Sequence, residues 1–312
     1  MGIIFFLGLA VRAFAADVPQ VFFDRSGNRI TVTKPYRRII SLYGAHTENL
    51  FALGLDREII GVSIHERFPP AALEKPVFSY HDDAEKIIAA RPDLVLVRPM
   101  IMRGYPGLIA KLENAGILVV SLQASMVGDM FAYWEKLGIL TGKEKEALKM
   151  ISEFQCGVEK IRQMAKQVLP SERKRVYFES MHARMKTFSP VSISIFALET
   201  AGGINVASDA RAVHGTNIAA YGKERIMAHA DEIDVYLAQK GPMNQVTQDV
   251  IRNEPGFAAI KAVREGRIYI VEEDIVSRPT LRLLEGIRTI FRILYPEIWA
   301  QNMQEFKTDY KK

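Results

Sequence analysis

Short apolar runs recur along the chain and alternate with segments of helical periodicity. In the first half, the apolar runs lie at residues 39–42, 59–62, 94–97 and 117–120. They predict strands that are buried on both faces, because strands of parallel sheets read as continuous apolar runs. The segments between them, such as 47–54 and 84–90, have helical spacing and end near glycine or proline. The pattern therefore predicts a parallel α/β sheet.

Two segments interrupt this alternation. Residues 21–32 contain two β-rich runs around a Ser-Gly-Asn turn, which predicts an amino-terminal hairpin. Between residues 143 and 168, apolar residues recur every three or four positions and Pro170 follows, which predicts one long helix. A second series of strands and helices follows. We therefore predict two Rossmann-like α/β lobes, at residues 16–142 and 170–298, with a connecting helix at 143–169 and a tail at 299–312.

The first residues predict secretion. Residues 3–11 are apolar, but this run is too short to span a membrane. Ala13-Phe14-Ala15 supplies the small-x-small pattern that precedes a cleavage site. We expect a signal peptide over residues 1–15, cleavage near Ala15, and a periplasmic protein.

Composition narrows the classes of function. The only cysteine, Cys156, excludes an intramolecular disulfide and a multi-cysteine metal cluster, and we expect it on the apolar side of the long helix. The net charge of +5 is too small for the dense basic face of a nucleic-acid-binding protein. The sequence has no zinc-protease His-Glu-x-x-His motif, no Gly-x-Ser-x-Gly motif, no P-loop and no Gly-x-Gly-x-x-Gly motif. These observations favour a binding protein over an enzyme. We expect a monomer.

A weak internal repeat supports two equivalent lobes. Segments 85–96 and 224–235 each begin with a glutamate, have isoleucine two positions later, and have an acidic residue eight positions later. Glu85 and Glu224 each open a predicted helix, where the helix dipole favours a carboxylate. A purely structural role therefore explains both residues as well as a functional one does.

The order of these segments resembles the class III periplasmic binding proteins, which serve ABC importers of iron-siderophores, haem and cobalamin. The resemblance extends from Val21 to about Ile298. It rests on the hairpin, on Thr47-Glu48 after the first strand, on Glu85-Lys86-Ile87 before Arg91-Pro92-Asp93, and on the long helix. It implies that Glu85 and Glu224 dock into arginine pockets on the two transmembrane subunits of a permease. It also implies a protein without a cofactor of its own.

The resemblance places the ligand between the lobes, at loops that follow the strands, in agreement with the general rule for open α/β sheets. Imidazole and thioether groups can ligate iron or cobalt, aromatic rings stack on macrocycles, and guanidinium groups pair with carboxylates. We expect an iron chelate, as a ferric siderophore or haem, and a corrinoid is the alternative. The candidate metal ligands are His46, His81 and His214. The candidate ligand-binding residues are Tyr43, His46, His65, His81, Arg98, Met102, Arg103, His182, Arg184, His214 and Arg278.

Two other functions stay open at this point. A chelatase-like or nitrogenase-like enzyme subunit also pairs α/β lobes around a metal cofactor, although such subunits are cytosolic and usually supply cysteine ligands. A binding protein that docks on a sensor would have the same sequence features as one that docks on a permease.

Overall fold

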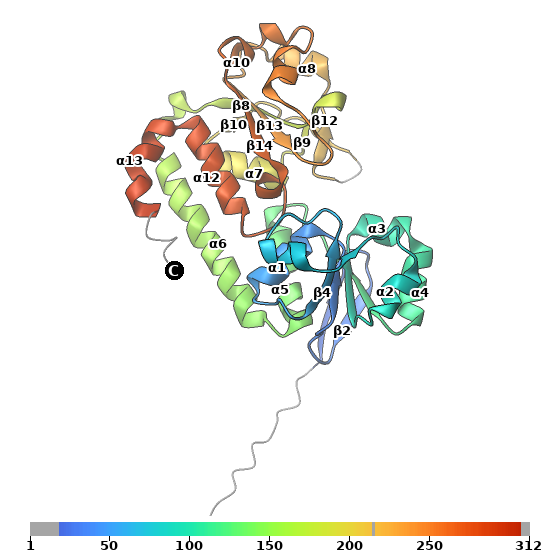
Figure 1. The fold of residues 1–312 in the computed structure, drawn as a ribbon. Coiled ribbons are helices and arrows are strands. Elements are labelled where there is room, and N and C mark those ends of the chain that lie inside the picture. Colours follow the sequence, from blue (N-terminus) through green and yellow to red (C-terminus); the bar gives the residue numbers. More distant parts are fainter. Residues whose placement is uncertain (1–18, 214–215, 307–312) are drawn as a thin grey trace, which may run out of the picture.

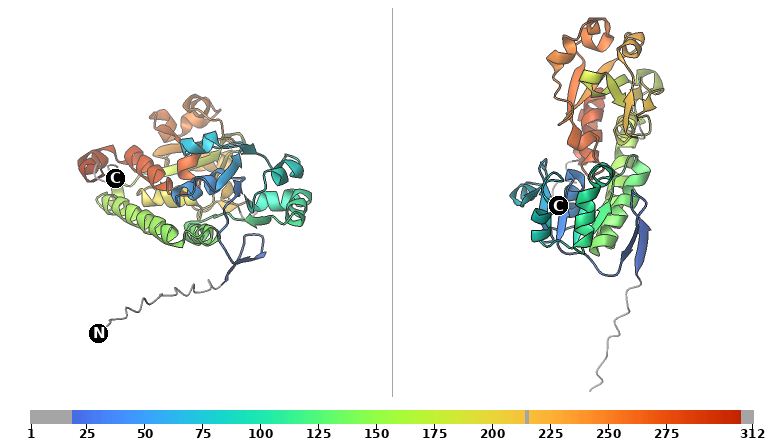
Figure 2. Two further views of the ribbon diagram at one scale, coloured as in Figure 1. Left: turned by 60° about the horizontal axis from the view of Figure 1, so that its bottom comes forward. Right: turned by 90° about the vertical axis from the view of Figure 1, so that its right-hand side faces the viewer.

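The computed structural model describes residues 19–213 and 216–306. It consists of two α/β lobes, one above the other in Figure 1, and helix α6 (Glu144–Ala165) runs along one side of both. The right-hand view in Figure 2 shows the same elongated, two-lobed body from the side. This confirms the predicted architecture and the long helix between the two sheets. The predicted signal peptide lies outside the described residues.

The amino-terminal lobe is built on a five-stranded sheet with the order β5-β4-β3-β6-β7, in which every paired neighbour is parallel. All residues of β3 and β6 are buried, which explains the continuous apolar runs of their sequences. The strands are β3 (Ile39–Ser41), β4 (Ile59–Ser63), β5 (Val77–Phe78), β6 (Leu94–Val97) and β7 (Leu118–Ser121). The helices are α1 (Gly44–Ala52), η1 (Pro70–Glu74), α2 (Ala84–Ala89), α3 (Pro99–Gly104), α4 (Pro106–Asn114) and α5 (Val127–Thr141).

The predicted amino-terminal hairpin is present as β1 (Gln20–Phe23) and β2 (Arg29–Val32), which pair in antiparallel register. Its turn lies at the carboxyl end of β7. There the Arg25 amide donates to the Ser121 carbonyl at 2.8 Å, and the Ser121 amide donates to the Asp24 carboxylate at 3.1 Å. These two hydrogen bonds therefore hold the hairpin turn against the carboxyl end of β7, which is an edge strand of the sheet.

The carboxy-terminal lobe has a mixed sheet, whereas the parallel sheet predicted from the first half of the chain is present in the amino-terminal lobe. Strands β9, β11 and β12 pair in antiparallel fashion, whereas β8 pairs in parallel with β10 and β13, and β13 with β14. The cause is local, because a parallel crossover needs a dozen or more residues and β9 follows β8 after a single 3-10 turn. The strands are β8 (Arg175–Met181), β9 (Lys186–Phe188), β10 (Ile204–Asn205), β11 (Arg211–Ala212), β12 (Ile218–Ala220), β13 (Val235–Lys240) and β14 (Ile268–Glu272).

Helices and 3-10 turns cover both faces of this second sheet and continue to the end of the described chain. They are η2 (Pro170–Glu172), η3 (His182–Arg184), α7 (Ile193–Thr200), α8 (Lys223–Ala228), α9 (Gln248–Arg252), η4 (Phe257–Ala259), α10 (Lys261–Arg264), α11 (Glu273–Val276), α12 (Leu283–Leu294) and α13 (Pro296–Phe306). Helix α13 includes residues that the sequence placed in a tail.

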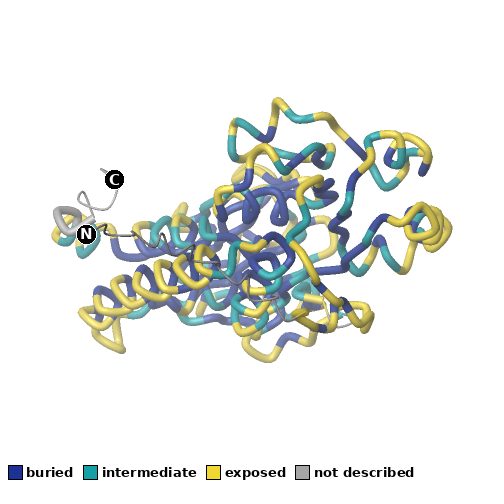
Figure 3. The backbone as a smooth tube through the Cα atoms, turned by 90° about the horizontal axis from the view of Figure 1, so that it is seen from below, coloured by how far each residue is buried: buried dark blue, intermediate teal, exposed yellow. Residues whose placement is uncertain are grey.

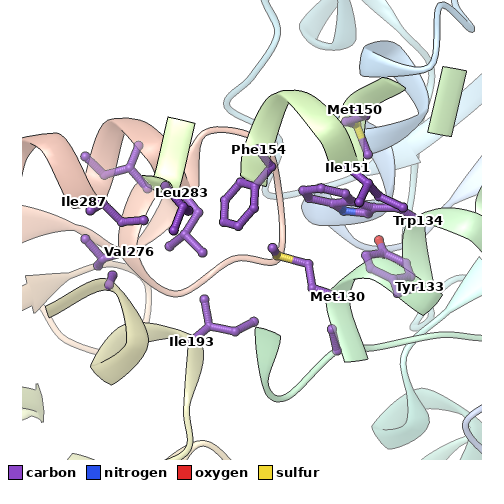
Figure 4. Packing of buried hydrophobic residues seen from close by; sticks show 14 of the residues in the cluster. Met130, Tyr133, Trp134, Met150, Ile151, Phe154, Ile193, Val276, Leu283 and Ile287 are labelled. Atoms are coloured by element: carbon purple, nitrogen blue, oxygen red, sulfur yellow. The ribbon is translucent and has the colours of Figure 1, made fainter. Parts of the chain in front are cut away.

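One hydrophobic core extends through both lobes along α6. Figure 4 shows Phe154 of α6 between Met130 and Trp134 of α5 on one side and Leu283 of α12 on the other. The rings of Trp134 and Phe154 meet edge to face at 5.6 Å between centroids. Ile193 of the carboxy-terminal lobe belongs to the same buried cluster. Separating the lobes would therefore expose a single apolar core to water.

The apolar stripe of α6 leaves Cys156 outside. Phe154, Val158 and Ile161 are buried, whereas Cys156 is exposed. Successive helical positions are rotated by about 100°, so a residue two positions after Phe154 faces away from it. The expectation that Cys156 lies on the apolar side is wrong. Figure 3 shows the general pattern, with buried positions in the middle of the molecule and exposed ones on outlying helices and loops.

Candidate functional site

The carboxyl ends of the strands in the two lobes meet between the lobes. Helix α1 begins at Gly44, directly after β3, and a Cβ atom at Gly44 would lie 2.6 Å from Nη1 of Arg278, which follows β14 and α11. Because the first sheet is parallel, the loops after β4, β5 and β6 lie along the same edge. Open α/β sheets bind ligands at such an edge. We call the loops after β3, β4, β5, β6, β8 and β14 the interlobe edge, and we take it as the candidate site.

Tyr43 and Arg98 form a contact at this edge. The Arg98 guanidinium lies over the Tyr43 ring at 4.6 Å from its centroid, a geometry in which a cation is attracted by the π face. Burial raises the pKa of Tyr43, so this phenol stays neutral. Tyr43 is half-buried under Arg98, so the pair places a guanidinium cation at this edge, and such a cation suits an anionic ligand.

His46 is part of the core and is not a surface ligand. Its side chain is fully buried, with Nδ1 at 2.7 Å from the Tyr133 hydroxyl and Nε2 at 3.2 Å from the Val97 carbonyl. The carbonyl can only accept, so Nε2 donates and Nδ1 accepts from Tyr133. Burial lowers the pKa of His46 to about 3. The prediction that His46 binds ligand or metal is wrong, because both ring nitrogens are occupied inside the lobe.

His182 is also turned inward. It follows β8, and its Nδ1 lies 2.8 Å from the buried carboxylate of Glu179. Its Nε2 faces Glu254 at 3.6 Å. The hydrogen bond to Glu179 raises the pKa of His182. His182 thus stabilises a buried carboxylate, and its predicted place among the ligand contacts is wrong.

The remaining predicted residues differ in exposure. His65, His81, Arg103 and Arg184 are exposed, and Met102 is half-buried. Met102 and Arg103 line a surface hollow of about 560 Å³ between the hairpin turn and helices α3 and α4. His214 lies outside the described residues.

His81 is the exposed histidine with an ordered surrounding. Its Nδ1 lies 3.2 Å from the Tyr105 hydroxyl. The Tyr80 ring lies 4.4 Å from the His81 ring and 4.9 Å from the Tyr105 ring, between centroids. Tyr80 and His81 lie in the loop after β5, and Tyr105 lies between α3 and α4. We call these three rings the Tyr80–His81–Tyr105 cluster.

A charged network that the sequence did not reveal joins the lobes. Arg67 of the first lobe lies 3.2 Å from Glu272 of the second. Arg278, a predicted ligand contact, is buried and pairs with Asp274 at 2.6 Å. The Arg278 guanidinium lies against Gly44 of the amino-terminal lobe, in space that a side chain at position 44 would need.

A second group of side chains crosses between the lobes beside this network. Arg282 lies 3.6 Å from the Glu48 carboxylate, and burial raises the pKa of Glu48. The side chains of Asn49 and Trp134 both donate to the Pro279 carbonyl, at 2.9 and 3.0 Å. Thr47-Glu48 was the one sequence signal for this contact region. Within residues 19–213 and 216–306, no group of three or more histidine, cysteine or acidic side chains is arranged to hold a metal ion.

Glu85 and Glu224 occupy matching positions on the two lobes. Each lies exposed in the first turn of a short helix, α2 and α8 respectively. Glu85 pairs with Lys111 at 3.1 Å. Its own backbone amide, and then Lys111, lower the pKa of the Glu85 carboxyl. In Figure 1 both helices lie on the side of the molecule away from α6.

Comparison with known proteins agrees with this architecture. The model of the periplasmic binding protein family matches residues 39–275. An uncharacterized ABC transporter substrate-binding lipoprotein of Bacillus subtilis is 27% identical over 290 residues, which cover 91% of this chain and 88% of that protein. A vitamin B12-binding protein of Vibrio cholerae is 22% identical over 261 residues, which cover 82% of this chain and 88% of that protein.

A solved structure has the same two-lobed fold. It is that of a possible iron-binding (periplasmic solute-binding) protein of Staphylococcus epidermidis, with 27% identity and a TM-score of 0.71. The similarity covers 84% of this chain and all of the other. Among the described helices, none combines the length and the apolar character that crossing a membrane requires.

Proposed function

Because the chain belongs to the periplasmic binding protein family, we propose that it is the solute-binding protein of an ABC importer and that its solute is a metal chelate. The observation that carries the proposal is the match of the family model over residues 39–275, which includes strands of both lobes and the helix between them. The name of the Bacillus relative, an ABC transporter substrate-binding lipoprotein, supports this transport role. The protein would act as a monomer in the periplasm, after cleavage near Ala15, without chemistry of its own.

The ligand class is an iron chelate, either a ferric siderophore or haem, and a corrinoid is the alternative. The proposal is supported by the residues of the interlobe edge. Arg98, which lies over the Tyr43 ring, offers a cation, and the Tyr80–His81–Tyr105 cluster offers aromatic rings and an exposed imidazole. The B12-binding relative supports the corrinoid. A cation and an imidazole suit an anionic metal chelate, because guanidinium groups pair with carboxylates and imidazole can ligate iron or cobalt.

Delivery would use Glu85 and Glu224. A carboxylate that enters an arginine pocket loses water and regains charge-assisted hydrogen bonds, whose bidentate geometry suits the guanidinium group. Truncating it leaves the partner cation buried and unpaired, at about 2–5 kcal/mol per site. A carboxylate that served only its own helix would contribute about 0.3–1 kcal/mol to folding. Loss of a docking carboxylate should therefore reduce permease-dependent uptake, whereas loss of a carboxylate that only stabilises its helix should reduce folding stability.

One set of experiments tests both parts of the proposal. Haemin, ferric siderophores, ferric citrate and cobalamin are screened by thermal shift, since a ligand at a hundredfold excess over its Kd adds about 2.7 kcal/mol to stability. Glu85→Ala, Glu224→Ala and the double variant are then assayed for ligand affinity, melting temperature and permease-dependent uptake. We expect lost uptake with unchanged affinity.

Glu146→Ala is the matched control for Glu85→Ala. Glu146 is exposed in the first turn of α6 and pairs with Lys143 at 3.2 Å. Its own backbone amide and then Lys143 lower the pKa of its carboxyl, as the corresponding groups do for Glu85. Uptake at the wild-type level in the double variant would disprove docking. A response only to sugars or amino acids would disprove the ligand class.

A further inference from the structure

We propose that Lys223 and Glu254 are positioning residues for the docking carboxylate Glu224, and that the buried pair of His182 and Glu179 beside them makes docking of this lobe depend on pH. The inference rests on the proposed function and adds the groups that hold one of its two docking residues. The carrying observation is a row of alternating charges that runs from β8 to the first turn of α8. We call Glu179, His182, Glu254 and Lys223 the charged row.

The charged row begins inside the carboxy-terminal lobe. The Glu179 side chain in β8 is fully buried. Its carboxylate accepts hydrogen bonds from the Tyr236 hydroxyl of β13 and, at 3.4 Å, from the side-chain amide of Asn244. Nδ1 of His182 lies 2.8 Å from the same carboxylate. Because a buried carboxylate is costly without such partners, these contacts hold Glu179 and His182 together as one unit.

The charged row continues from His182 to the surface. Nε2 of His182 lies 3.6 Å from the Glu254 carboxylate, and the other oxygen of Glu254 lies 2.6 Å from Nζ of Lys223. The exposed fraction of the side chain rises along the row, from 0% for Glu179 and 10% for His182 to 22% for Glu254 and 34% for Lys223. Solvent therefore screens the pair of Lys223 and Glu254 less than it screens an ion pair between fully exposed side chains.

The outer end of the row holds the helix that carries Glu224. Lys223 is the first residue of the six-residue helix α8, and Glu224 follows it directly. The residue before them, Gly222, has no side chain to cap the helix, and its amide donates to the Met185 carbonyl at 3.0 Å. The first turn is thus held from outside, by the Lys223 side chain and the Gly222 backbone. Without the Lys223 contact, Glu224 would sample more positions, and ordering it on a permease would cost more entropy.

The docking helix of the amino-terminal lobe is held differently. The residue before Glu85 is Ala84, which cannot form an ion pair. Glu85 pairs with Lys111, and the two side chains are 69% and 61% exposed. Damage to the charged row should therefore impair docking through Glu224 and leave docking through Glu85 intact.

Protonation of His182 changes its contact with Glu254. Nδ1 faces the Glu179 carboxylate, which accepts hydrogen bonds, so Nδ1 carries a proton in both charge states of the ring. In the neutral ring, Nε2 is then an acceptor that faces another acceptor, the Glu254 carboxylate. In the charged ring, Nε2 carries a proton and can donate it to Glu254. The inner support of Glu254 therefore depends on the charge of His182.

The direction of the pH dependence follows from the groups around the ring. The titratable groups that face His182 are Glu179 of β8 and Glu254 after α9, and Tyr236 and Lys223 contact these two carboxylates in turn. The hydrogen bond to Glu179 raises the pKa of His182 from its ordinary value of 6.5. The charged ring therefore prevails at pH 6.5, and its contact with Glu254 is lost as the pH rises through the raised pKa. Docking through Glu224 should weaken over the same range.

The test measures the affinity of the ligand-free protein for its permease in lipid nanodiscs, so that no chelate has to be identified. Lys223→Met removes the ammonium group but keeps an unbranched side chain. We expect it to weaken permease binding by about threefold or more, as coupling within one charged network implies. The substitution should have no further effect in a Glu224→Ala background, because it acts through that carboxylate, but should keep its full effect in a Glu85→Ala background. Lys223→Arg should restore binding.

Lys143→Met is the matched control. Lys143 directly precedes α6, pairs with Glu146 at 3.2 Å, and has a side chain that is 27% exposed, close to the 34% of Lys223. Figure 1 shows α6 on the side of the molecule away from α2 and α8. We expect wild-type affinity for the permease. Melting temperatures check that every variant folds.

The pH dependence is tested on the same permease, so that titration of the permease itself affects all variants equally. His182→Gln keeps an amide donor for Glu179 but cannot titrate, and Glu254→Gln removes the carboxylate that faces Nε2. From pH 6.5 to about pH 8.5, the wild type should lose about threefold in affinity relative to each of these two variants. Lys143→Met should keep the wild-type pH profile.

The outcomes separate this inference from the proposed function. Wild-type affinity of Lys223→Met, or an equal loss in the Glu224→Ala background, would overturn the positioning role while docking by Glu224 stands. Identical pH profiles for the wild type, His182→Gln and Glu254→Gln would overturn the role of the buried pair. Wild-type permease binding by the double variant of Glu85 and Glu224 would instead overturn the proposed docking, and this inference with it.

Discussion

His46 makes the free energy of unfolding depend on pH. Its ring is fully buried, and burial lowers its pKa to about 3 from an ordinary value of 6.5. Between these two values the unfolded chain binds a proton that the folded chain rejects. Stability therefore rises with pH in this range and is lost as the pH falls from 6.5 toward 3.

The magnitude follows from the two pKa values. Lowering the pH from 7 to 4 should cost about 3 kcal/mol through His46 alone, because each unit of pKa difference corresponds to about 1.4 kcal/mol. Carboxylates titrate in the same range, so the total loss cannot be assigned to one group. The comparison with a variant that lacks the imidazole isolates its share.

His46→Gln is the decisive variant. At pH 7 it should be less stable by about 1–3 kcal/mol, since a buried hydrogen-bonded group is replaced imperfectly. At pH 4 the difference from the wild type should shrink by about 3 kcal/mol or reverse. Urea unfolding at each pH measures both values. Tyr133→Phe is the control: it removes the hydroxyl bonded to Nδ1 but keeps the imidazole, so it should keep the acid-dependent loss. The reasoning would be refuted if the free energies of unfolding of His46→Gln and the wild type differed by the same amount at pH 7 and at pH 4.

Two further predictions concern the packing between elements. Gly286→Ala should destabilise the protein by about 1–3 kcal/mol by overpacking, because the new Cβ would clash with the Ile275 carbonyl oxygen. A raised melting temperature would contradict this. Because both lobes share one core, ligand binding should close them by only a few degrees. Small-angle scattering with and without ligand checks this, and a large compaction would count against it.

The sequence predicted the strands that are buried on both faces of their sheet. Strands β3 and β6 are continuous apolar runs because neither face meets water. Helix α3 was missed because Arg98-Pro99 follows β6 directly and reads as a loop, although proline is favoured in the first turn of a helix. The short antiparallel strands β11 and β12 carry too few residues for a period of two to be recognised.

The candidate site was predictable as a set of loops but not as a set of contacts. His46 and His81 are both histidines that follow an apolar strand within a few residues, so their sequences do not distinguish them. Tertiary packing distinguishes them. His46 is buried against Tyr133, which lies far along the chain, whereas His81 contacts Tyr105 and stays exposed. The pairing of Arg67 with Glu272 joins residues that no local pattern connects.

The shared core also constrains how docking can work. Rotating one lobe away from the other would expose Trp134 and Phe154, at about 1.5–3 kcal/mol for each large apolar side chain, and would break the hydrogen bonds to the Pro279 carbonyl. The separation between Glu85 and Glu224 is therefore set by the folded core, since each lies on a helix of a different lobe. If both dock on a permease, the ligand-free protein presents nearly the same spacing as the loaded one. Discrimination between the two forms must then come from the ligand itself and from the loops of the interlobe edge, not from the angle between the lobes.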